Sequence, residues 1–443
     1  MTHALPCCSK RPRGSLAGRT TRRKVFETAV ATGVGAFMLS FTNCRRQEAS
    51  FERAAGVADR GSWPQWRGPA SDGRVSRLPA RLSSLRVRWR APLAGEGPAG
   101  ITAADGRVAV ADHGEGRDIY RLVDLVSGRE CWRCERDNHL DLDYGSAPRA
   151  APLLAGDSLF VLGAGGDLPC LRLADGEPRW RRNLLTDFGK AELPTWGYCS
   201  SPLLVDGKLV VNPGAVGASL VALTPSDGSL SWAAEGAAAN YASLIGGRFG
   251  ETLQVIGYDQ KGLCGWACDS GRLLWRVETG LGKGYVVPTP VSWENHLIVA
   301  HERGTELYAF EHGGSIVAKP LASTRQLAPS LGTPTVAGRW LLGHDRRGVV
   351  AVSLEDRLAS CWREPRNERR KGMAHWVAQD DGERALLFCQ SGWAFLVDLS
   401  GAEPAIIDQR QLTDATWSHP AVLETAILCR DRNTLYCYET LEG

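Results

Sequence analysis

The sequence lacks the short motifs that mark most catalytic sites. Its nine histidines form no HxH or HExxH pattern, and no GxSxG segment is present. No glycine-rich loop precedes a helical stretch, so neither a serine hydrolase nor a nucleotide-binding protein is supported. The one CxxC motif, Cys131 to Cys134, is followed by Glu135 and has no second pair at zinc spacing. This excludes a c-type haem site and a zinc site there, and no metal site is predicted.

Basic charge is also scarce once the N-terminus is set aside. The whole chain has a formal net charge of +3, but beyond residue 43 acidic residues slightly outnumber basic ones. The sequence contains no stripe of basic residues that could bind the phosphate groups of a nucleic acid, so no nucleic-acid partner is expected. Long apolar runs are missing as well, since residues 29–41 fall short of the roughly 20 residues that span a bilayer. We expect a monomer whose only membrane attachment is an N-terminal anchor.

The N-terminal segment has the features of an export signal. Arg22-Arg23 precede the short apolar run, as in twin-arginine signals, which direct folded proteins for export. Cys44 closes the segment and is a candidate for lipidation, the alternatives being a plain signal or an uncleaved anchor with an incidental cysteine. We therefore predict an export signal over 1–44, a polar tether over 45–61 and one folded domain over 62–443, located in the periplasm or cell envelope.

Glycine and tryptophan, in contrast, are abundant, with 50 and 15 residues. Five tryptophans each follow a glycine turn: Trp132, Trp180, Trp232, Trp275 and Trp362. The first four are 43 to 52 residues apart. The last interval, 87 residues, equals two periods in which a tryptophan is missing near Val317. A period of this length is typical of one four-stranded blade of a β-propeller. The repeat predicts an all-β propeller.

One copy of the repeat shows the expected strands. The apolar segment 201–205 is followed by the turn Asp206-Gly207, a second strand over 208–212 and a third over 219–223. Asp227-Gly228 then leads into a fourth strand with Trp232, and we expect this turn to aim the indole. Asp-Gly between apolar runs favours a tight hairpin, because glycine accepts positive φ. Small residues about ten positions before the tryptophans, such as Ala222 and Ala309, are expected to pack against the indoles.

Counting first strands gives eight blades. They begin near Ile101, Ala151, Ser201, Tyr241, Thr289, Thr333, Met373 and His419. The last copy has residues for three strands and no closing tryptophan, while the strand 85–90, with Trp89, has no partners before it. We predict that this N-terminal strand completes the last blade, which removes exposed sheet edges.

These repeats resemble those of the exported bacterial PQQ-like (pyrroloquinoline quinone) repeat propellers, whose blades carry a tryptophan-docking pattern. The segment Trp63-Pro64-Gln65-Trp66-Arg67-Gly68-Pro69 is similar to one in this group, as are Trp196-Gly197-Tyr198 and Pro288-Thr289-Pro290. The resemblance extends over nearly the whole folded domain. It implies a fold shared with the outer-membrane assembly lipoprotein BamB and with quinoprotein dehydrogenases.

The resemblance to quinoprotein dehydrogenases implies a specific cofactor site. There the quinone stacks on a tryptophan, a vicinal Cys-Cys disulfide covers it, calcium is held by Glu and Asn, and an Asp acts as base. Here the one Cys-Cys pair, Cys7-Cys8, lies inside the export signal. No cofactor is therefore expected, and PQQ with calcium is the alternative. Other cysteines are free to pair in an oxidising compartment, for example Cys264 with Cys268 or Cys429 with Cys437.

Candidate binding residues lie in the loops that lead into the innermost strands, because these loops surround the mouth of a propeller channel. They are Trp196, Tyr198, Tyr241, Lys283, Tyr285, His375, Trp376, Trp417 and His419. The leading hypothesis is a non-catalytic binding or assembly scaffold of the cell envelope with an unidentified protein partner or ligand. The alternatives are a PQQ-dependent alcohol or sugar dehydrogenase with an atypical site, and a protein that binds carbohydrate through its aromatic mouth.

Overall fold

The computed structural model describes residues 61–95, 97–189, 191–278 and 285–440. The predicted export signal, Cys44 and nearly all of the tether lie outside these residues, as does Lys283. Within the described ranges, no helix is long and apolar enough to cross a membrane. The helical structure found there is a single 3-10 turn, η1 (Glu368–Arg370).

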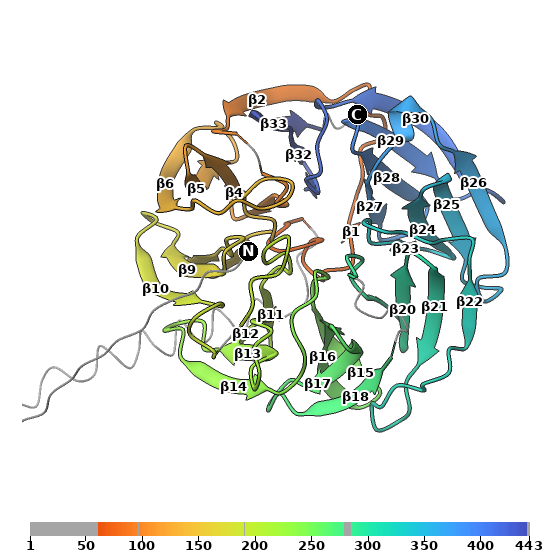
Figure 1. The fold of residues 1–443 in the computed structure, drawn as a ribbon. Coiled ribbons are helices and arrows are strands. Elements are labelled where there is room, and N and C mark those ends of the chain that lie inside the picture. The colour runs from red at the N-terminus through yellow and green to blue at the C-terminus, as the bar shows by residue number, and fades with distance from the viewer. Residues whose placement is uncertain (1–60, 96, 190, 279–284, 441–443) are drawn as a thin grey trace, which may run out of the picture. The chain divides into compact units, whose positions relative to one another are not determined.

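The strands form eight antiparallel sheets arranged as the blades of a ring, as predicted (Figure 1). Each blade runs from an inner to an outer strand. The strands of the first four blades are β3 (Thr102–Ala104), β4 (Arg107–Gly114), β5 (Arg117–Asp124) and β6 (Glu130–Asp137); β7 (Leu153–Ala155), β8 (Ser158–Phe160), β9 (Asp167–Arg172) and β10 (Pro178–Asn183); β11 (Leu203–Val205), β12 (Lys208–Val211), β13 (Leu220–Leu223) and β14 (Leu230–Ala234); and β15 (Ile245–Phe249), β16 (Thr252–Asp259), β17 (Gly262–Ala267) and β18 (Leu273–Val277).

The second half of the ring continues the pattern. Its blades consist of β19 (Val291–Trp293), β20 (His296–His301), β21 (Gly304–Ala309) and β22 (Ala322–Thr324); β23 (Thr335–Ala337), β24 (Trp340–Asp345), β25 (Gly348–Ser353) and β26 (Cys361–Pro365); β27 (Ala374–Gln379), β28 (Arg384–Cys389), β29 (Trp393–Asp398) and β30 (Ala405–Gln411); and β31 (Ala421–Val422), β32 (Ala426–Arg430) and β33 (Thr434–Glu439).

The last blade is closed by a strand from the other end of the folded domain. β2 (Arg86–Pro92) pairs antiparallel with β33, with Arg86 opposite Glu439 and Pro92 opposite Thr434. In Figure 1 the orange β2 lies beside the blue β33. The predicted ring closure is therefore confirmed.

Neighbouring blades are joined by a repeated contact between an indole and a glycine turn. Four tryptophans donate from Nε1 to a backbone carbonyl of the next blade at 2.8–2.9 Å: Trp89 to Leu125, Trp132 to Leu173, Trp180 to Pro225 and Trp232 to Cys268. The glycine three residues after each carbonyl lies against the same indole, with positive φ: Gly128, Gly176, Gly228 and Gly271. A Cβ on these glycines would lie 2.4–2.7 Å from the indole, so only glycine fits.

This contact corrects the expected role of the Asp-Gly turn. The turn at Gly228 does not aim Trp232 of its own blade, because it receives Trp180 of the preceding blade. Within its own blade Trp232 lies opposite Ala222, as the spacing predicts. Turn and tryptophan therefore serve two different blade interfaces.

Two blades depart from the predicted strands. In the fifth blade the fourth strand is β22 at 322–324, after Val317, but Val317 N donates to Ala309 O at 2.9 Å, so the position that lacks the tryptophan does lie beside Ala309. The seventh blade has an additional strand, β1 (Arg74–Val75), which pairs parallel with β27. β1 is too short to leave a pattern in the sequence.

The ten cysteines from Cys131 to Cys437 are all free thiols in the structure. The pairs suggested for an oxidising compartment, Cys264 with Cys268 and Cys429 with Cys437, are therefore not formed. These four side chains are buried, and burial raises their thiol pKa values, to about 12 for Cys437. They behave as small apolar residues of the core.

The segment before β2 crosses the ring near its axis. Trp63 forms an isolated antiparallel β-bridge with Ala103 of the first blade, and the carbonyl of Pro64 accepts a hydrogen bond from the backbone N–H of Leu154 in the second blade. Arg67 is 1% exposed and donates to Thr333 O, Pro334 O and Thr335 Oγ1 of the sixth blade at 2.8–3.0 Å. Burial lowers the pKa of Arg67 to about 10 against the opposing effect of Asp72. The segment ties blades from both sides of the ring together.

The blade contact predicts a difference between two glycines of the third blade. Gly207→Ala places a Cβ where nothing lies within 4 Å, so only the positive φ of +67° is penalised, by about 1–2 kcal/mol. Gly228→Ala has the same φ penalty at +68° and adds a clash 2.7 Å from Trp180, which brings the expected loss to about 2–4 kcal/mol. Denaturant unfolding of both variants measures the difference, and equal losses would contradict the docking contact.

Candidate functional site

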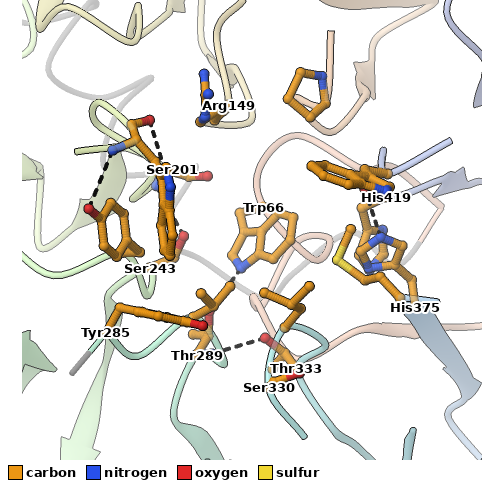
Figure 2. Close-up of a pocket in the computed structure, with 18 of the residues that line it drawn as sticks. Trp66, Arg149, Ser201, Ser243, Tyr285, Thr289, Ser330, Thr333, His375 and His419 are labelled. Carbon is orange, nitrogen blue, oxygen red and sulfur yellow. Dashed lines mark hydrogen bonds between the residues drawn. The ribbon is translucent and has the colours of Figure 1, made fainter. Parts of the chain in front are cut away.

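The loops between the blades converge on a pocket at the ring axis (Figure 2). Its volume is about 450 Å³, within the range of roughly 300–1,000 Å³ common for small-molecule sites. Every connection between blades contributes a residue, and Trp66 comes from the segment that crosses the axis. The lining residues are Trp66, Pro98, Tyr144, Arg149, Trp196, Cys199, Ser201, Tyr241, Ser243, Tyr285, Val287, Thr289, Ser330, Leu331, Thr333, Arg346, Met373, His375, Trp417 and His419.

Hydroxyl groups at the starts of the blades form one part of the wall. Ser201 Oγ accepts from Ala151 N at 2.9 Å, and Ser243 Oγ accepts from Ser201 N at 3.0 Å. On the other side, Thr333 Oγ1 accepts from Thr289 N at 2.9 Å. Ser201, Thr289 and Thr333 each precede a proline, which favours extended backbone. Each hydroxyl that accepts from a neighbouring blade is held in place and still has its own hydrogen to donate.

Trp66 stands among these hydroxyl groups in Figure 2. Its Nε1 donates to Thr289 Oγ1 at 3.2 Å, and its ring meets the His419 ring edge-on at 5.2 Å between centroids. Sequence reasoning noticed the segment around Trp66 only as a family resemblance. Its place in the pocket depends on a crossing of the axis that no local pattern reveals.

Five further aromatic rings form an arc at the mouth. Trp196 lies 4.5 Å from Tyr285 and 4.9 Å from Tyr241, measured between ring centroids. Tyr144 continues the arc, at 6.4 Å from Trp196 and 5.4 Å from Trp417. Tyr285, Tyr144 and Trp417 are exposed. Exposed rings in a concave surface offer flat apolar faces with polar edges to a ligand.

Tyr144 is a member of this arc that sequence reasoning missed. It is 69% exposed and has a φ of +64°, a conformation that is uncommon for residues other than glycine. Arg149 stabilises this loop by donating to the carbonyls of Asp143, Gly145 and Ala147 at 2.8–2.9 Å. The loop thus holds an exposed ring over the pocket at a conformational cost, which favours a role in binding.

Two histidines complete the wall opposite the hydroxyl groups. His375 Nε2 lies 3.0 Å from Trp417 O, and His419 Nδ1 lies 2.6 Å from Pro420 O. A carbonyl oxygen only accepts, so these nitrogens hold the ring protons and leave His375 Nδ1 and His419 Nε2 as acceptors. His419 Nε2 is buried and has no partner among the described residues.

Both histidines are neutral in the folded protein. Burial lowers the pKa of His375 to about 4. Burial, together with the neighbouring His375 ring 4.7 Å away, also lowers the pKa of His419 well below its usual range. Both side chains therefore line the pocket as neutral imidazoles, and His419 Nε2 itself is buried.

Six of the nine candidate residues line this pocket: Trp196, Tyr241, Tyr285, His375, Trp417 and His419. Trp376 does not, because successive residues of a strand point to opposite faces, and β27 directs His375 to the axis and Trp376 into the core. Tyr198 is likewise buried, with its hydroxyl donating to Pro213 O at 3.0 Å. Lys283 lies outside the described residues.

The chemical character of the lining limits which cofactor the pocket fits. Among the lining residues that the structure describes there is no carboxylate, and the described ranges hold no cluster of three metal-ligating side chains. The described lining does not fit calcium-bound PQQ, because it contains neither an acidic base nor carboxylate ligands. The described lining instead offers aromatic rings for stacking, hydroxyl groups as hydrogen-bond donors, and neutral hydrogen-bond acceptors.

The two histidines predict a dependence of stability on pH. Between pH 6.5 and about 4 the unfolded chain takes up protons that folded His375 and His419 do not, so the free energy of unfolding falls as pH decreases. Each histidine adds up to about 1.4 kcal/mol per pH unit to this slope. Denaturant unfolding across this range should give shallower slopes for His375→Gln and His419→Gln. His312→Gln, at an 87% exposed side chain, is the control, and unchanged slopes in all three would contradict the assignment.

Comparisons with known proteins agree with this architecture. The solved structure of BamB from Moraxella catarrhalis is 15% identical and covers 81% of this chain and 98% of its own, with a TM-score of 0.57. A quinohemoprotein alcohol dehydrogenase, ADHIIG from Pseudomonas putida HK5, is 9% identical and covers 89% and 82%, with a TM-score of 0.60. At these identities the likeness shows the fold alone. No curated protein matches the sequence.

A family profile matches the sequence more directly. It is described as "Outer membrane protein assembly factor BamB" and aligns with residues 80–233 and 122–364, which together make up more than half of the chain. The matched ranges contain the four tryptophans that dock between blades, Trp89, Trp132, Trp180 and Trp232. The protein therefore belongs to the BamB-like family of PQQ-like repeat β-propellers.

Proposed function

We propose that the protein is an exported, non-catalytic carbohydrate-binding propeller of the cell envelope, with the axial pocket as its binding site. One observation carries this proposal: an arc of aromatic rings faces hydroxyl groups and neutral histidines in a pocket of about 450 Å³. The C–H faces of a sugar ring pack against aromatic rings, while its hydroxyl groups both donate and accept hydrogen bonds. Each kind of group in the pocket has a counterpart on a sugar.

This proposal specifies the axial pocket as the binding surface of the scaffold and carbohydrate as its ligand. BamB, whose fold the chain shares, is described as an outer membrane protein assembly factor, and the N-terminal twin arginine supports export. A PQQ-dependent dehydrogenase is the less favoured function, since its calcium and base need acidic side chains. A carbohydrate-binding site needs no acidic side chain, because the hydroxyl groups of the sugar are bound by hydrogen bonds and its ring faces by stacking.

Isothermal titration of the full-length protein with neutral hexasaccharides tests the proposal. Cello-, xylo-, manno- and galacto-hexasaccharides form the panel, and at least one is expected to bind with a dissociation constant below about 1 mM. Tyr144→Gly is expected to weaken binding about 3- to 10-fold by removing one stacking ring. Because glycine accepts a φ of +64° without strain, the variant should be no less stable than the parent.

The matched control is Trp293→Ala. Trp293 is a half-buried indole at the end of β19, away from the pocket lining, so its removal should leave affinity unchanged. Reduction of an electron-accepting dye by the PQQ- and calcium-loaded protein with alcohol or sugar substrates would contradict the proposal and favour the dehydrogenase. So would equal affinities for the parent and Tyr144→Gly.

A further inference from the structure

A second cavity adjoins the axial pocket on the side of the fifth and sixth blades. Its volume is about 400 Å³, and it shares Ser330 and Arg346 with the axial pocket. Ser330 appears at that edge of the pocket in Figure 2. The two cavities are therefore adjacent, with Ser330 and Arg346 in the walls of both.

The second cavity is rich in arginine. Four of the side chains that line it are Arg303, Arg325, Arg346 and Arg347, against two acidic ones, Glu302 and Asp345. Asp345 is already neutralised, because Arg347 Nη2 and Arg363 Nη1 each lie 2.9 Å from its carboxylate oxygens. Although burial opposes them, these hydrogen bonds hold the pKa of Asp345 below its usual range. The space keeps an excess of positive charge.

Two of these arginines are available to a ligand. Arg346 lies in the turn between β24 and β25, and Arg325 follows β22; both are exposed. Over the ranges that the structure describes, neither guanidinium engages in a side-chain hydrogen bond or ion pair. Arg347, in contrast, is held by Asp345 and by the carbonyls of Arg325 and Gln326. Arg346 also lines the axial pocket, so it stands where the two cavities meet.

The planar fork of a guanidinium matches the paired oxygens of a carboxylate or a sulfate ester. A neutral sugar could accept only ordinary hydrogen bonds from Arg325 and Arg346, without any attraction between opposite charges, and a cation would be repelled. An anionic group next to a bound sugar ring would gain from both arginines, within a concave surface that excludes part of the solvent.

We propose that the natural ligand is an anionic oligosaccharide, with a sugar ring in the axial pocket and its carboxylate or sulfate ester in the second cavity at Arg346 and Arg325. This inference rests on the proposed function, since it names the class of carbohydrate that the same site binds. Uronic acids and sulfated sugars share the chemistry, and the experiment separates them.

Matched charged and neutral hexasaccharides test the inference on the full-length protein by isothermal titration. One pair is oligogalacturonate with its methyl-esterified form, and the other is an oligosaccharide of sulfated galactan with its desulfated form. In at least one pair the charged member is expected to bind at least tenfold more tightly than its neutral partner. Raising the ionic strength from 0.05 to 0.5 M should weaken the charged member alone, because salt screens exposed charges.

The variant Arg325→Gln is the sharpest probe, because Arg325 lines only the second cavity. It should reduce the affinity for the charged member at least threefold and leave the neutral member unchanged, and Arg346→Gln should act in the same direction. The control is Arg129→Gln, at an exposed arginine in the β5–β6 turn on the opposite face of the ring.

The possible results separate the two proposals. Equal binding of charged and neutral members would overturn the anionic ligand and leave the carbohydrate-binding function intact. A preference for the charged member that Arg325→Gln and Arg346→Gln do not reduce would also overturn it, since the charge would be bound elsewhere. Absence of binding by all four oligosaccharides and by the neutral panel up to about 1 mM would overturn both.

Discussion

The contact between an indole and a glycine turn determines how this chain becomes a ring. The indole fills the gap between the outer strands of two blades, and its N–H reaches a carbonyl that is otherwise left without a partner at the turn. Because the same contact recurs between successive blades, the blades adopt similar angles to one another. The inner strands then cannot meet at the axis, and the space that remains is the axial pocket.

The contact also varies where the sequence varies. Trp275 of the fourth blade does not reach a glycine turn and instead donates to Gln254 Oε1 at 2.7 Å, while Gln254 Nε2 donates to Gly314 O of the fifth blade at 2.6 Å. An amide side chain thus relays the hydrogen bond across this interface. The fifth blade, whose outer strand β22 has no tryptophan, is held in the ring by this relay and by the hydrogen bond from Thr289 N to Thr333 Oγ1.

The number of blades could be predicted because each repeat has a local signal, a glycine turn and a tryptophan at a fixed distance. The pocket could be predicted only in part. His375 and Trp376 are neighbours, and which of them faces the axis depends on the register of β27, for which the sequence around Met373 has no proline as a reference. Tyr144 acquires its role from Trp196, in the loop before the third blade, and from Trp417, in the loop before the eighth, while Trp66 acquires its role from a crossing of the axis. Such roles follow from contacts between distant segments, which no local pattern contains.

The pairing of β2 with β33 also constrains how the chain folds. Residues 86–92 are made long before their partners at 434–439. Until β33 is made, β2 has no partner strand, and another chain could pair with its open edges. Contacts between residues so far apart in the sequence are also slow to form, because a long loop must close first. Closure of the ring is therefore a late step, and a chain that stops before β31 would keep most of its blades as an open, aggregation-prone arc.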